Sequence, residues 1–169
     1  MQPRLYLFVG APGAGKTTTA TIIAKRTGAV HLWADVERHK LFPRPSHTEA
    51  ESKVLYQKLN NDTNQLLSEG KSVVFDTNFN FYSDRQLLRN LAQSHNAEVV
   101  LVWLTTPLNI AKGRAVGTHQ QRNGYTIHMS EDQFNAITAK LEPPRPDEHA
   151  IQIDGTKLKE EQIKQALRI

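Results

Sequence analysis

At 169 residues, with 38% hydrophobic and 22% charged side chains, the chain has the length and composition of one globular domain with its own core. The absence of cysteine excludes disulfides and thiolate metal sites and is typical of a cytoplasmic protein. The formal net charge of +4 favours an anionic ligand but does not by itself indicate nucleic-acid binding. The first apolar run, residues 5–9, is too short for a signal peptide or a membrane span, so we expect no membrane association.

The first half of the chain predicts short strands that alternate with helices. Residues 4–9 are rich in β-branched and aromatic side chains and stop at glycine, which indicates a strand. Helical spacing follows over residues 14–27 and ends at Gly28. A second strand is expected over residues 29–34, before the break FPRPS. Ser46 and Glu49 have the spacing of a capping box, which predicts a long helix that ends at Gly70.

The second half repeats the alternation. The run EVVLVWL, residues 98–104, is apolar after its first residue, as expected for a strand buried on both faces. Capping boxes at Ser83/Gln86 and Ser130/Gln133 predict two helices. Pro143 and Pro144 should stop the second of them. The remaining elements are strands over residues 72–75 and 150–153 and helices over residues 107–115 and 158–167.

The resulting order is β-α-β-α-β-α-β-α-α-β-α. Regular alternation of strands and helices predicts an α/β fold with a parallel sheet and helices on both faces. The chain contains no internal repeat, no low-complexity tract and no linker long enough to divide it. We therefore expect one domain over residues 1–169.

The segment GAPGAGKT matches the phosphate-binding pattern G-x-x-x-x-G-K-[ST] and lies between a predicted strand and a predicted helix, as that pattern requires. Glycines let backbone N–H groups turn toward phosphate oxygens, and the helix start adds its unpaired N–H groups. Lys16 is expected to reach the β- and γ-phosphates of ATP, and the Thr17 hydroxyl to ligate Mg²⁺. The predicted nucleotide-binding residues are Gly10, Ala11, Pro12, Gly13, Ala14, Gly15, Lys16, Thr17 and Thr18.

A second Mg²⁺ anchor is expected at Asp76, which ends the predicted strand SVVFD. The alternative is an Asp/Asn-rich turn that closes the strand. Asp35, in HLWADVER, is predicted to end the second strand, with Arg38 one helical turn later. Because carboxyl ends of parallel strands line the ligand crevice, Asp35 is a candidate general base and Arg38 a candidate anion-binding or orienting group. The alternative is a surface ion pair between Asp35 and Arg38.

A basic segment follows the fourth predicted strand. Residues 99–130 contain no acidic side chain but include Lys112, Arg114 and Arg122. Mobile arginines can neutralise charge on the oxygens of a transferring phosphoryl group. Residues of about 113–129 therefore indicate a flexible lid between two helices, with a solvated basic loop as the alternative.

Three function classes stay open at this point. A kinase is favoured, because the base-reading motif of regulatory GTPases is absent and the chain is too short for a ring-forming ATPase with a helical lid domain. A nucleotide-binding regulatory ATPase without an acceptor is the second hypothesis. A nucleic-acid-binding module is the third, supported only by mild basicity. Phe81 and Tyr125 are plausible acceptor contacts, and the region of residues 40–55 and the lid are expected to form the acceptor pocket.

The segments GAPGAGKTT, WADVER and FDTNFN…R, together with the basic lid, resemble the P-loop kinase group that includes the 5′-hydroxyl polynucleotide kinases of bacteriophages. Zeta-toxin-like kinases, chloramphenicol phosphotransferase and gluconate kinase are similar more distantly. The resemblance covers residues 5–153. It implies a five-stranded parallel sheet as in adenylate kinase, ATP and Mg²⁺ as cofactors, and a hydroxyl acceptor that is either a polynucleotide 5′ end or a small molecule.

The same resemblance implies roles for individual residues. It makes Asp35 the general base, Arg38 an acceptor-binding arginine, Asp76 the acid near the metal and Asn78 a polar residue of the same crevice. Arg114 and Arg122 match the region of the lid arginines. The lid is longer here than in the phage enzymes, so the resemblance leaves open which of these two arginines is catalytic.

Overall fold

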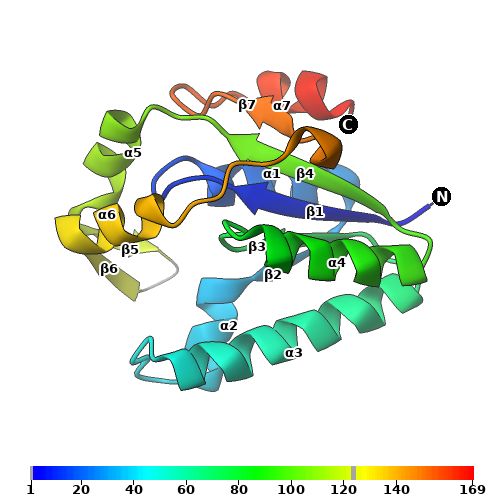
Figure 1. Cartoon of the computed structure of the whole chain (residues 1–169), viewed down its shortest axis with the longest axis horizontal. Helices are drawn as coiled ribbons and strands as arrows, with labels where there is room; N and C mark the ends of the chain where they lie inside the picture. Colours follow the sequence, from blue (N-terminus) through cyan, green and yellow to red (C-terminus); the bar gives the residue numbers. More distant parts are fainter. Residues whose placement is uncertain (1, 123–124) are drawn as a thin grey trace.

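Five parallel strands form the central sheet, in the order β2-β3-β1-β4-β7 (Figure 1). The computed structural model describes residues 2–122 and 125–169, with the side chains of residues 118–127 outside the description. The five-stranded parallel sheet predicted from the alternation and the resemblance is confirmed. The strands are β1 (Arg4–Val9), β2 (Val30–Trp33), β3 (Val73–Asp76), β4 (Glu98–Leu104) and β7 (Ile151–Ile153).

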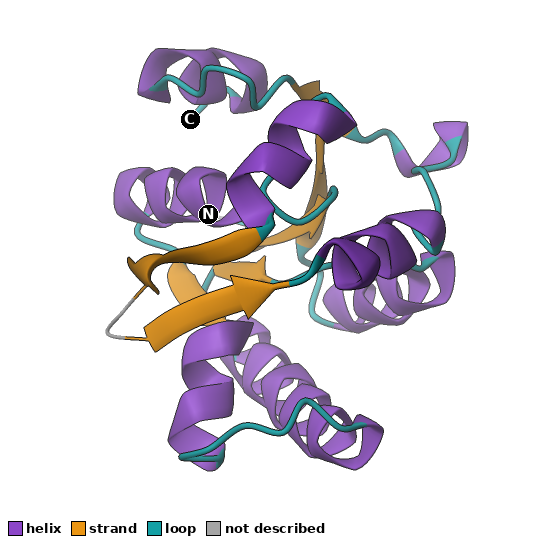
Figure 2. Cartoon of the chain, turned by 90° about the vertical axis from the view of Figure 1, so that its left-hand side faces the viewer, coloured by secondary structure: helices purple, strands orange, loops and turns teal. Residues whose placement is uncertain are grey.

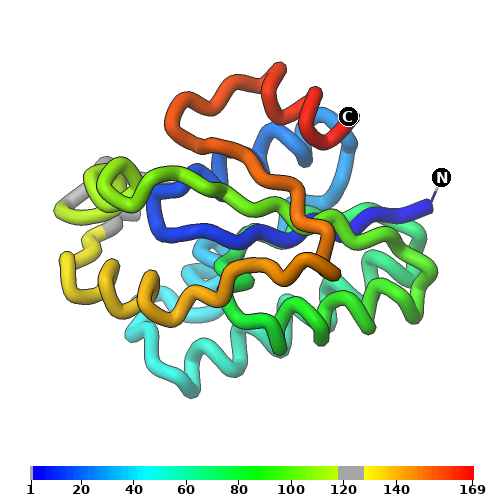
Figure 3. The backbone as a smooth tube through the Cα atoms, turned by 45° about the horizontal axis from the view of Figure 1, so that its top comes forward, coloured from blue at the N-terminus to red at the C-terminus, as the bar shows by residue number. Residues whose placement is uncertain are grey.

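Helices cover both faces of this sheet (Figures 1 and 3). On one face, α1 (Lys16–Thr27) and α7 (Glu160–Leu167) enclose a hydrophobic cluster that includes Ile23 and Ile163. On the other face, α3 (Glu49–Ser68) and α4 (Tyr82–Ser94) enclose a second cluster that includes Leu59 and Leu88. β1 lies between β3 and β4, so its apolar side chains are buried on both faces.

A short helix that the sequence pattern did not predict follows β2 directly. The expectation that Asp35 ends the second strand is wrong, because β2 ends at Trp33 and α2 (Ala34–Leu41) begins at the next residue. Asp35 and Glu37 lie in the first turn of α2, where carboxylates interact favourably with the helix dipole. Asp35 is still only two residues after Trp33, the last residue of β2. Trp33 pairs with Asp76 in the sheet, so Asp35 follows β2 at the level where β3 ends.

Two of the three predicted capping boxes are wrong. Thr48, not Ser46, caps α3, and its side chain accepts a hydrogen bond from the Glu51 N–H. α4 begins at Tyr82 without a side-chain cap of its own; instead the Tyr82 N–H donates to Glu142 at 2.8 Å. The third box is confirmed: α6 (Glu131–Ala139) has both reciprocal bonds between its cap residue and the third residue of the helix.

A β-hairpin occupies much of the segment expected to be a flexible lid. β5 (Gly117–Arg122) and β6 (Tyr125–Met129) pair in antiparallel register between α5 (Leu108–Ala115) and α6 (Figure 2). The hairpin lies at the end of the molecule toward which β1 and β4 point (Figure 1). At its base, Phe134 of α6 and Ala111 of α5 pack with Ala11 of the phosphate loop in a small hydrophobic cluster.

A buried ion pair ties the segment between α6 and β7 to α4. The Arg85 guanidinium donates to both carboxylate oxygens of Glu148, at 2.7 and 2.9 Å, and also to the carbonyls of Phe79 and Glu142. Glu148 ends a short 3₁₀ helix, Pro146–Glu148. Arg85 and Glu148 are 1% and 4% exposed, so the pair is a structural element of the interior.

None of the helices in the part of the chain that the structure describes combines the length and the apolar composition of a membrane span.

Candidate active site

The loop between β1 and α1 is held in a conformation that requires glycine at two positions. Gly13 has φ +78°, and a Cβ there would lie 2.2 Å from the carbonyl oxygen of Ala111 in α5. Gly15 has φ +109° and is the N-cap of α1. A side chain at either position would strain the backbone or clash with a neighbour. The two glycines therefore allow a tight turn directly before α1, and a tight turn at a helix start is the arrangement that binds phosphate in P-loop proteins.

Lys16 reaches back over this loop. Its ammonium group donates to the carbonyls of Gly10 and Ala11, at 2.8 and 2.7 Å. These contacts hold the cation against the backbone of the phosphate loop. A cation in that position is suited to polyphosphate oxygens. The remaining predicted nucleotide-binding residues, Pro12, Ala14 and Thr18, lie in the same loop and the first turn of α1.

Thr17 and Asp76 meet at the carboxyl ends of the strands, as their positions in the sequence predict. The Thr17 hydroxyl donates to the Asp76 carboxylate at 3.3 Å, because β1 and β3 are parallel neighbours. Asp76 is 4% exposed. A hydroxyl and a buried carboxylate next to a phosphate loop are the protein ligands that suit Mg²⁺ bound to a nucleotide. The described residues contain no cluster of three or more His, Asp or Glu side chains that could hold a metal ion without a nucleotide.

His31 is a site residue that the sequence reasoning missed. Its Nε2 lies 3.1 Å from the second oxygen of the Asp76 carboxylate, and its ring stacks on Trp33 at a centroid distance of 5.4 Å. Alternation along β2 puts His31 and Trp33 on one face of the sheet, which is the signal that could have linked them. Asp76 is therefore oriented from two sides, by Thr17 and by His31.

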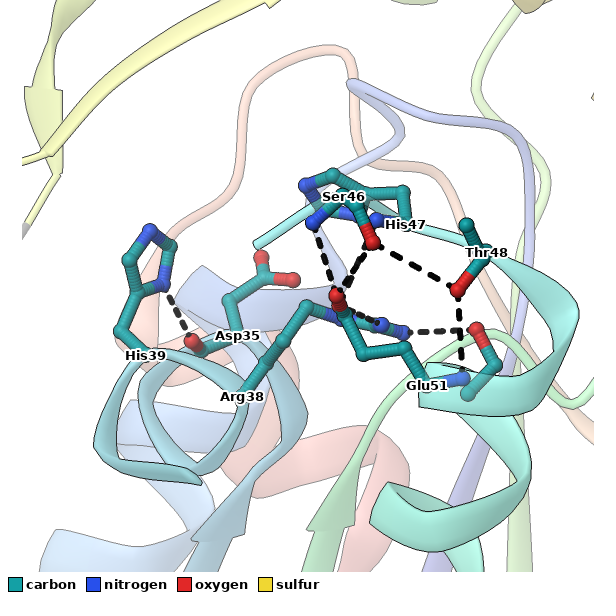
Figure 4. A network of polar contacts seen from close by, with 8 residues as sticks. Asp35, Arg38, His39, Ser46, His47, Thr48 and Glu51 are labelled. Carbon is teal, nitrogen blue, oxygen red and sulfur yellow. Dashed lines mark hydrogen bonds and ion pairs between the residues drawn. The ribbon is translucent and has the colours of Figure 1, made fainter. Parts of the chain in front are cut away.

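Asp35 and Arg38 do not form the surface ion pair that we considered. Arg38 is buried and donates to Glu51 at 2.7 Å and to the Ser52 hydroxyl at 3.1 Å (Figure 4). Asp35 is exposed, and no described group hydrogen-bonds to its carboxylate; only its backbone carbonyl accepts a bond, from His39. Arg38 thus fastens α2 to α3, while the Asp35 carboxylate is available for other contacts.

Glu51 is the centre of that fastening. Besides Arg38, its carboxylate accepts bonds from the Ser46 N–H, the Ser46 hydroxyl and the His47 N–H, at 2.7 to 3.3 Å (Figure 4). Burial works to raise the pKa of Glu51, but the bonds from Arg38, Ser46 and His47 outweigh it and hold the pKa at about 2. The carboxylate is therefore ionised at neutral pH, and the loop before α3 is bound to it.

This network makes the stability of the protein depend on pH. Because the folded-state pKa of Glu51 is about 2 and its ordinary value is 4.5, the ionised network stabilises the fold above about pH 4.5 and is lost as the pH falls toward 2. A Glu51→Gln variant should melt below the wild type at pH 7, and the difference in Tm should shrink as the pH approaches 2. Thermal unfolding followed by circular dichroism across this range, with Glu49→Gln as an exposed control on the same helix, measures it. A difference in Tm that stays constant with pH would contradict this account of Glu51.

Arg114 holds the backbone beside the phosphate loop. Its guanidinium donates to the carbonyls of Gly155 and Thr156, at 2.9 and 2.6 Å. Gly155 packs so tightly that a Cβ there would lie 2.1 Å from the carbonyl oxygen of Ala14. Arg114 therefore lies at the end of α5 and joins the loop after β7 to the nucleotide loop. The side chain of the other predicted lid arginine, Arg122, lies outside the described residues.

Comparison with known proteins assigns the chain to a family. A family model described as an AAA domain matches residues 5–144, which is most of the chain. No curated protein matches the sequence.

The fold is similar to that of several solved structures, each covering 99% of this chain. A candidate kinase from Chloroflexus aurantiacus has 18% identity and a TM-score of 0.75, over 96% of its own chain. A sugar kinase from Janibacter has 23% identity and a TM-score of 0.71, over 94% of its chain. The APS kinase of Mycobacterium tuberculosis, solved with AMPPNP and APS, has 19% identity and a TM-score of 0.71, over 96% of its chain. At these identities the likeness shows a shared fold.

Proposed function

We propose that this chain, which belongs to that AAA domain family, is an ATP- and Mg²⁺-dependent kinase that transfers the γ-phosphoryl group to the hydroxyl of an acceptor. The observation that carries the proposal is the grouping at one edge of the sheet. There the phosphate loop, the Thr17–Asp76 contact and the Asp35 carboxylate, to which no described group hydrogen-bonds, follow three neighbouring strands. A nucleotide switch needs the first two features, but it has no use for a carboxylate on the acceptor side.

The proposed reaction assigns one task to each group. The backbone N–H groups of the phosphate loop and Lys16 bind the β- and γ-phosphates. Thr17 and Asp76 would hold Mg²⁺, which would supply neutralisation of the phosphate charge. Asp35 accepts the proton of the acceptor hydroxyl. The oxygen of that hydroxyl bonds to the γ-phosphorus of ATP, and the bond between the γ-phosphorus and the β-phosphate oxygen breaks. ADP leaves, and the phosphorylated acceptor is released.

The arginines have different tasks in this scheme. Arg38, which is paired with Glu51, positions the helix that carries Asp35. Arg122, on the hairpin strand β5, is the candidate to neutralise the equatorial oxygens of the transferring group. Arg114 supports the loop after β7 in the structure, so its part in catalysis would be through the nucleotide side of the site.

The alternative is a regulatory ATPase without a phosphoryl acceptor, and the match to an AAA domain family is the observation that favours it. Both functions require MgATP binding, and only the kinase requires an acceptor-side base. The acceptor proposed from the sequence is a polynucleotide 5′-hydroxyl or a small molecule. One of the similar structures is a sugar kinase, which supports a small-molecule acceptor.

Nucleotide binding itself is tested at Lys16. A Lys16→Ala variant removes charge-assisted hydrogen bonds to the phosphates that are worth about 1.5–3 kcal/mol, so its MgATP affinity should fall about 10- to 150-fold. Calorimetry measures the affinity, and transfer from labelled ATP should fall in parallel. Lys25→Ala, an exposed lysine on the same helix, should leave both unchanged. An unchanged affinity in a folded Lys16→Ala variant would rule out this phosphate site.

A further inference from the structure

A cavity opens directly beside the proposed reaction centre. It encloses about 430 Å³ between α3, the start of α4, the end of α6 and the loop that follows Asp76. Thr77 and Asn78, the two residues after Asp76, line it, and so does Phe81, which is 41% exposed. This volume is in the range of small-molecule sites, which is about 300–1,000 Å³.

The wall of this cavity combines apolar side chains, which supply most of its surface, with polar groups, and its described residues carry no net charge. Asp84 and Lys140 are the two charged residues in that wall, and they have opposite signs. The other polar groups are the hydroxyls of Tyr56 and Thr77 and the side-chain amides of Asn60, Asn78 and Asn80. Amides and hydroxyls both donate and accept hydrogen bonds, which suits a ligand that is rich in hydroxyl groups.

The electrostatics of the wall disfavour an acceptor with several phosphates. Proteins that bind a polynucleotide backbone neutralise its phosphates with several lysines or arginines, whereas the described wall offers one lysine and an opposing carboxylate. The Asp84 carboxylate has no hydrogen-bond partner within the described residues, so it can accept bonds from hydroxyl groups. Burial raises the pKa of Asp84, Arg85 lowers it, and the nearby Glu142 carboxylate raises it further, so the wall around Asp84 is already unfavourable to a second anion.

The cavity also adjoins the proposed base. The Tyr56 hydroxyl lies 2.8 Å from the Thr77 hydroxyl, in the cavity wall. Burial raises the pKa of Tyr56. The Thr77 hydrogen bond and the Arg38 charge oppose it, and the carboxylates of Asp35 and Asp84 raise it further. One phenol therefore lies within electrostatic reach of the proposed base and of the carboxylate in the cavity. The backbone gives the same connection, because Thr77 and Asn78 in the cavity wall directly follow Asp76, and Asp76 pairs in the sheet with Trp33, two residues before Asp35.

The space continues along the outer surface. A second cavity, of about 460 Å³, shares Asn60 and Leu87 with the first and runs between α3 and α4. Its polar residues are all side-chain amides, from Gln57, Asn60, Asn61, Asn64 and Asn90. An acceptor longer than one ring could therefore extend from the first cavity without meeting a charge among the described residues.

We propose that the first cavity binds the phosphoryl acceptor, and that this acceptor is a small, electrically neutral polyhydroxyl compound of the size of a mono- or disaccharide. The proposal rests on the kinase function proposed above. One acceptor hydroxyl loses its proton to Asp35 and bonds to the γ-phosphorus of ATP, whose bond to the β-phosphate oxygen breaks. Asn60, Asn78 and Asp84 hold the remaining hydroxyls, and the Phe81 ring covers an apolar face of the ligand.

The experiment has a transfer arm and a binding arm, both with the full chain. In the transfer arm, labelled ATP is offered with neutral compounds (glucose, maltose, myo-inositol and glycerol), anionic compounds (gluconate and glucose 6-phosphate) and a short 5′-hydroxyl DNA strand. In the binding arm, ligand-observed NMR detects the same compounds without ATP. In the transfer arm, we expect the label to appear in a neutral compound. In the binding arm, we expect the same compound to bind when ATP is absent.

Variants locate the site. Asn60→Ala should raise the acceptor KM about fivefold or more and Asp84→Ala about tenfold or more, with the KM for ATP unchanged. Asn135→Ala, an exposed amide on α6 that lines neither cavity, is the matched control and should change neither KM. Thermal unfolding of each variant checks that the fold is retained.

The outcomes separate this inference from the kinase proposal. Transfer to DNA or to an anionic compound, with none to neutral compounds, would keep the kinase and overturn the neutral acceptor. Transfer to a neutral compound with a KM that neither cavity variant changes would overturn the assigned cavity. Binding of a neutral compound that Asn60→Ala weakens, without any transfer, would support the cavity and contradict the kinase. Absence of both binding and transfer for every neutral compound would overturn the inference.

Discussion

An Asp35→Asn variant should lose phosphoryl transfer by about 10²–10⁴-fold while it keeps its affinity for MgATP. The exchange preserves the size of the side chain and removes both its negative charge and its ability to accept a proton. The Asp35 carboxylate has no hydrogen-bond partner within the described residues, so the variant should lose only the interaction with the α2 dipole, about 0.3–1 kcal/mol, and its Tm should fall only slightly. Loss of a negative charge near the γ-phosphate should leave ATP affinity equal or slightly higher.

Three measurements on one preparation decide the role of Asp35: transfer to the acceptor found in the screen, ATP affinity by calorimetry, and Tm. Asp132→Asn, an exposed carboxylate on α6, is the control. Because the transition state of phosphoryl transfer is loose, the need for a strong base is modest, and a fall near the lower end of the range fits the proposal. Wild-type transfer by a folded Asp35→Asn enzyme would refute the base and move the regulatory ATPase ahead.

An Arg85→Met variant should lose about 3–5 kcal/mol of folding stability, because it leaves the Glu148 carboxylate buried without its partner. Native domains are stable by about 5–15 kcal/mol, so this loss is a large share of the total. Urea unfolding measures it. The matched control is Arg26→Met in the exposed Arg26–Glu160 pair, which should cost no more than about 1 kcal/mol.

The double variant Arg85→Met/Glu148→Met gives the sharper result. Replacing both members of a buried ion pair by apolar side chains is often neutral, so the double variant should be more stable than Arg85→Met alone. A double variant at least as unstable as the sum of the two single variants would mean that the pair itself is not the source of the loss. In that case the hydrogen bonds from the Arg85 guanidinium to the backbone carbonyls of Phe79 and Glu142 would carry the stabilisation.

The sheet could be predicted because each of its strands is an apolar run bounded by turn residues, as in EVVLVWL. The meeting of Thr17 and Asp76 could be predicted too, because both follow strands that point the same way. α2 could not, since it begins at the residue after β2 with no glycine, proline or polar cap between them. The hairpin could not either, because THQQR is a run of polar side chains with little strand preference.

The errors at α3 and at Arg38 have one cause. Two overlapping patterns, Ser46 to Glu49 and Thr48 to Glu51, both satisfy the spacing of a capping box, and local sequence does not choose between them. In the structure Thr48 is the cap, and the Glu51 carboxylate pairs with the buried Arg38. A partner 13 positions away, across a loop with two prolines, is a tertiary contact that no local pattern reports. The same contact explains why Arg38 does not pair with Asp35.

The two ends of the β5–β6 hairpin are connected to different parts of the molecule. The first end follows α5, where Arg114 hydrogen-bonds to the carbonyls of Gly155 and Thr156 beside the nucleotide loop. The second end continues into α6. Shortly after α6, the Glu142 N–H donates to the carbonyl of Asn80, which lines the proposed acceptor cavity. The hairpin therefore joins the nucleotide side of the site to the proposed acceptor side, so the two proposed binding sites are not structurally independent.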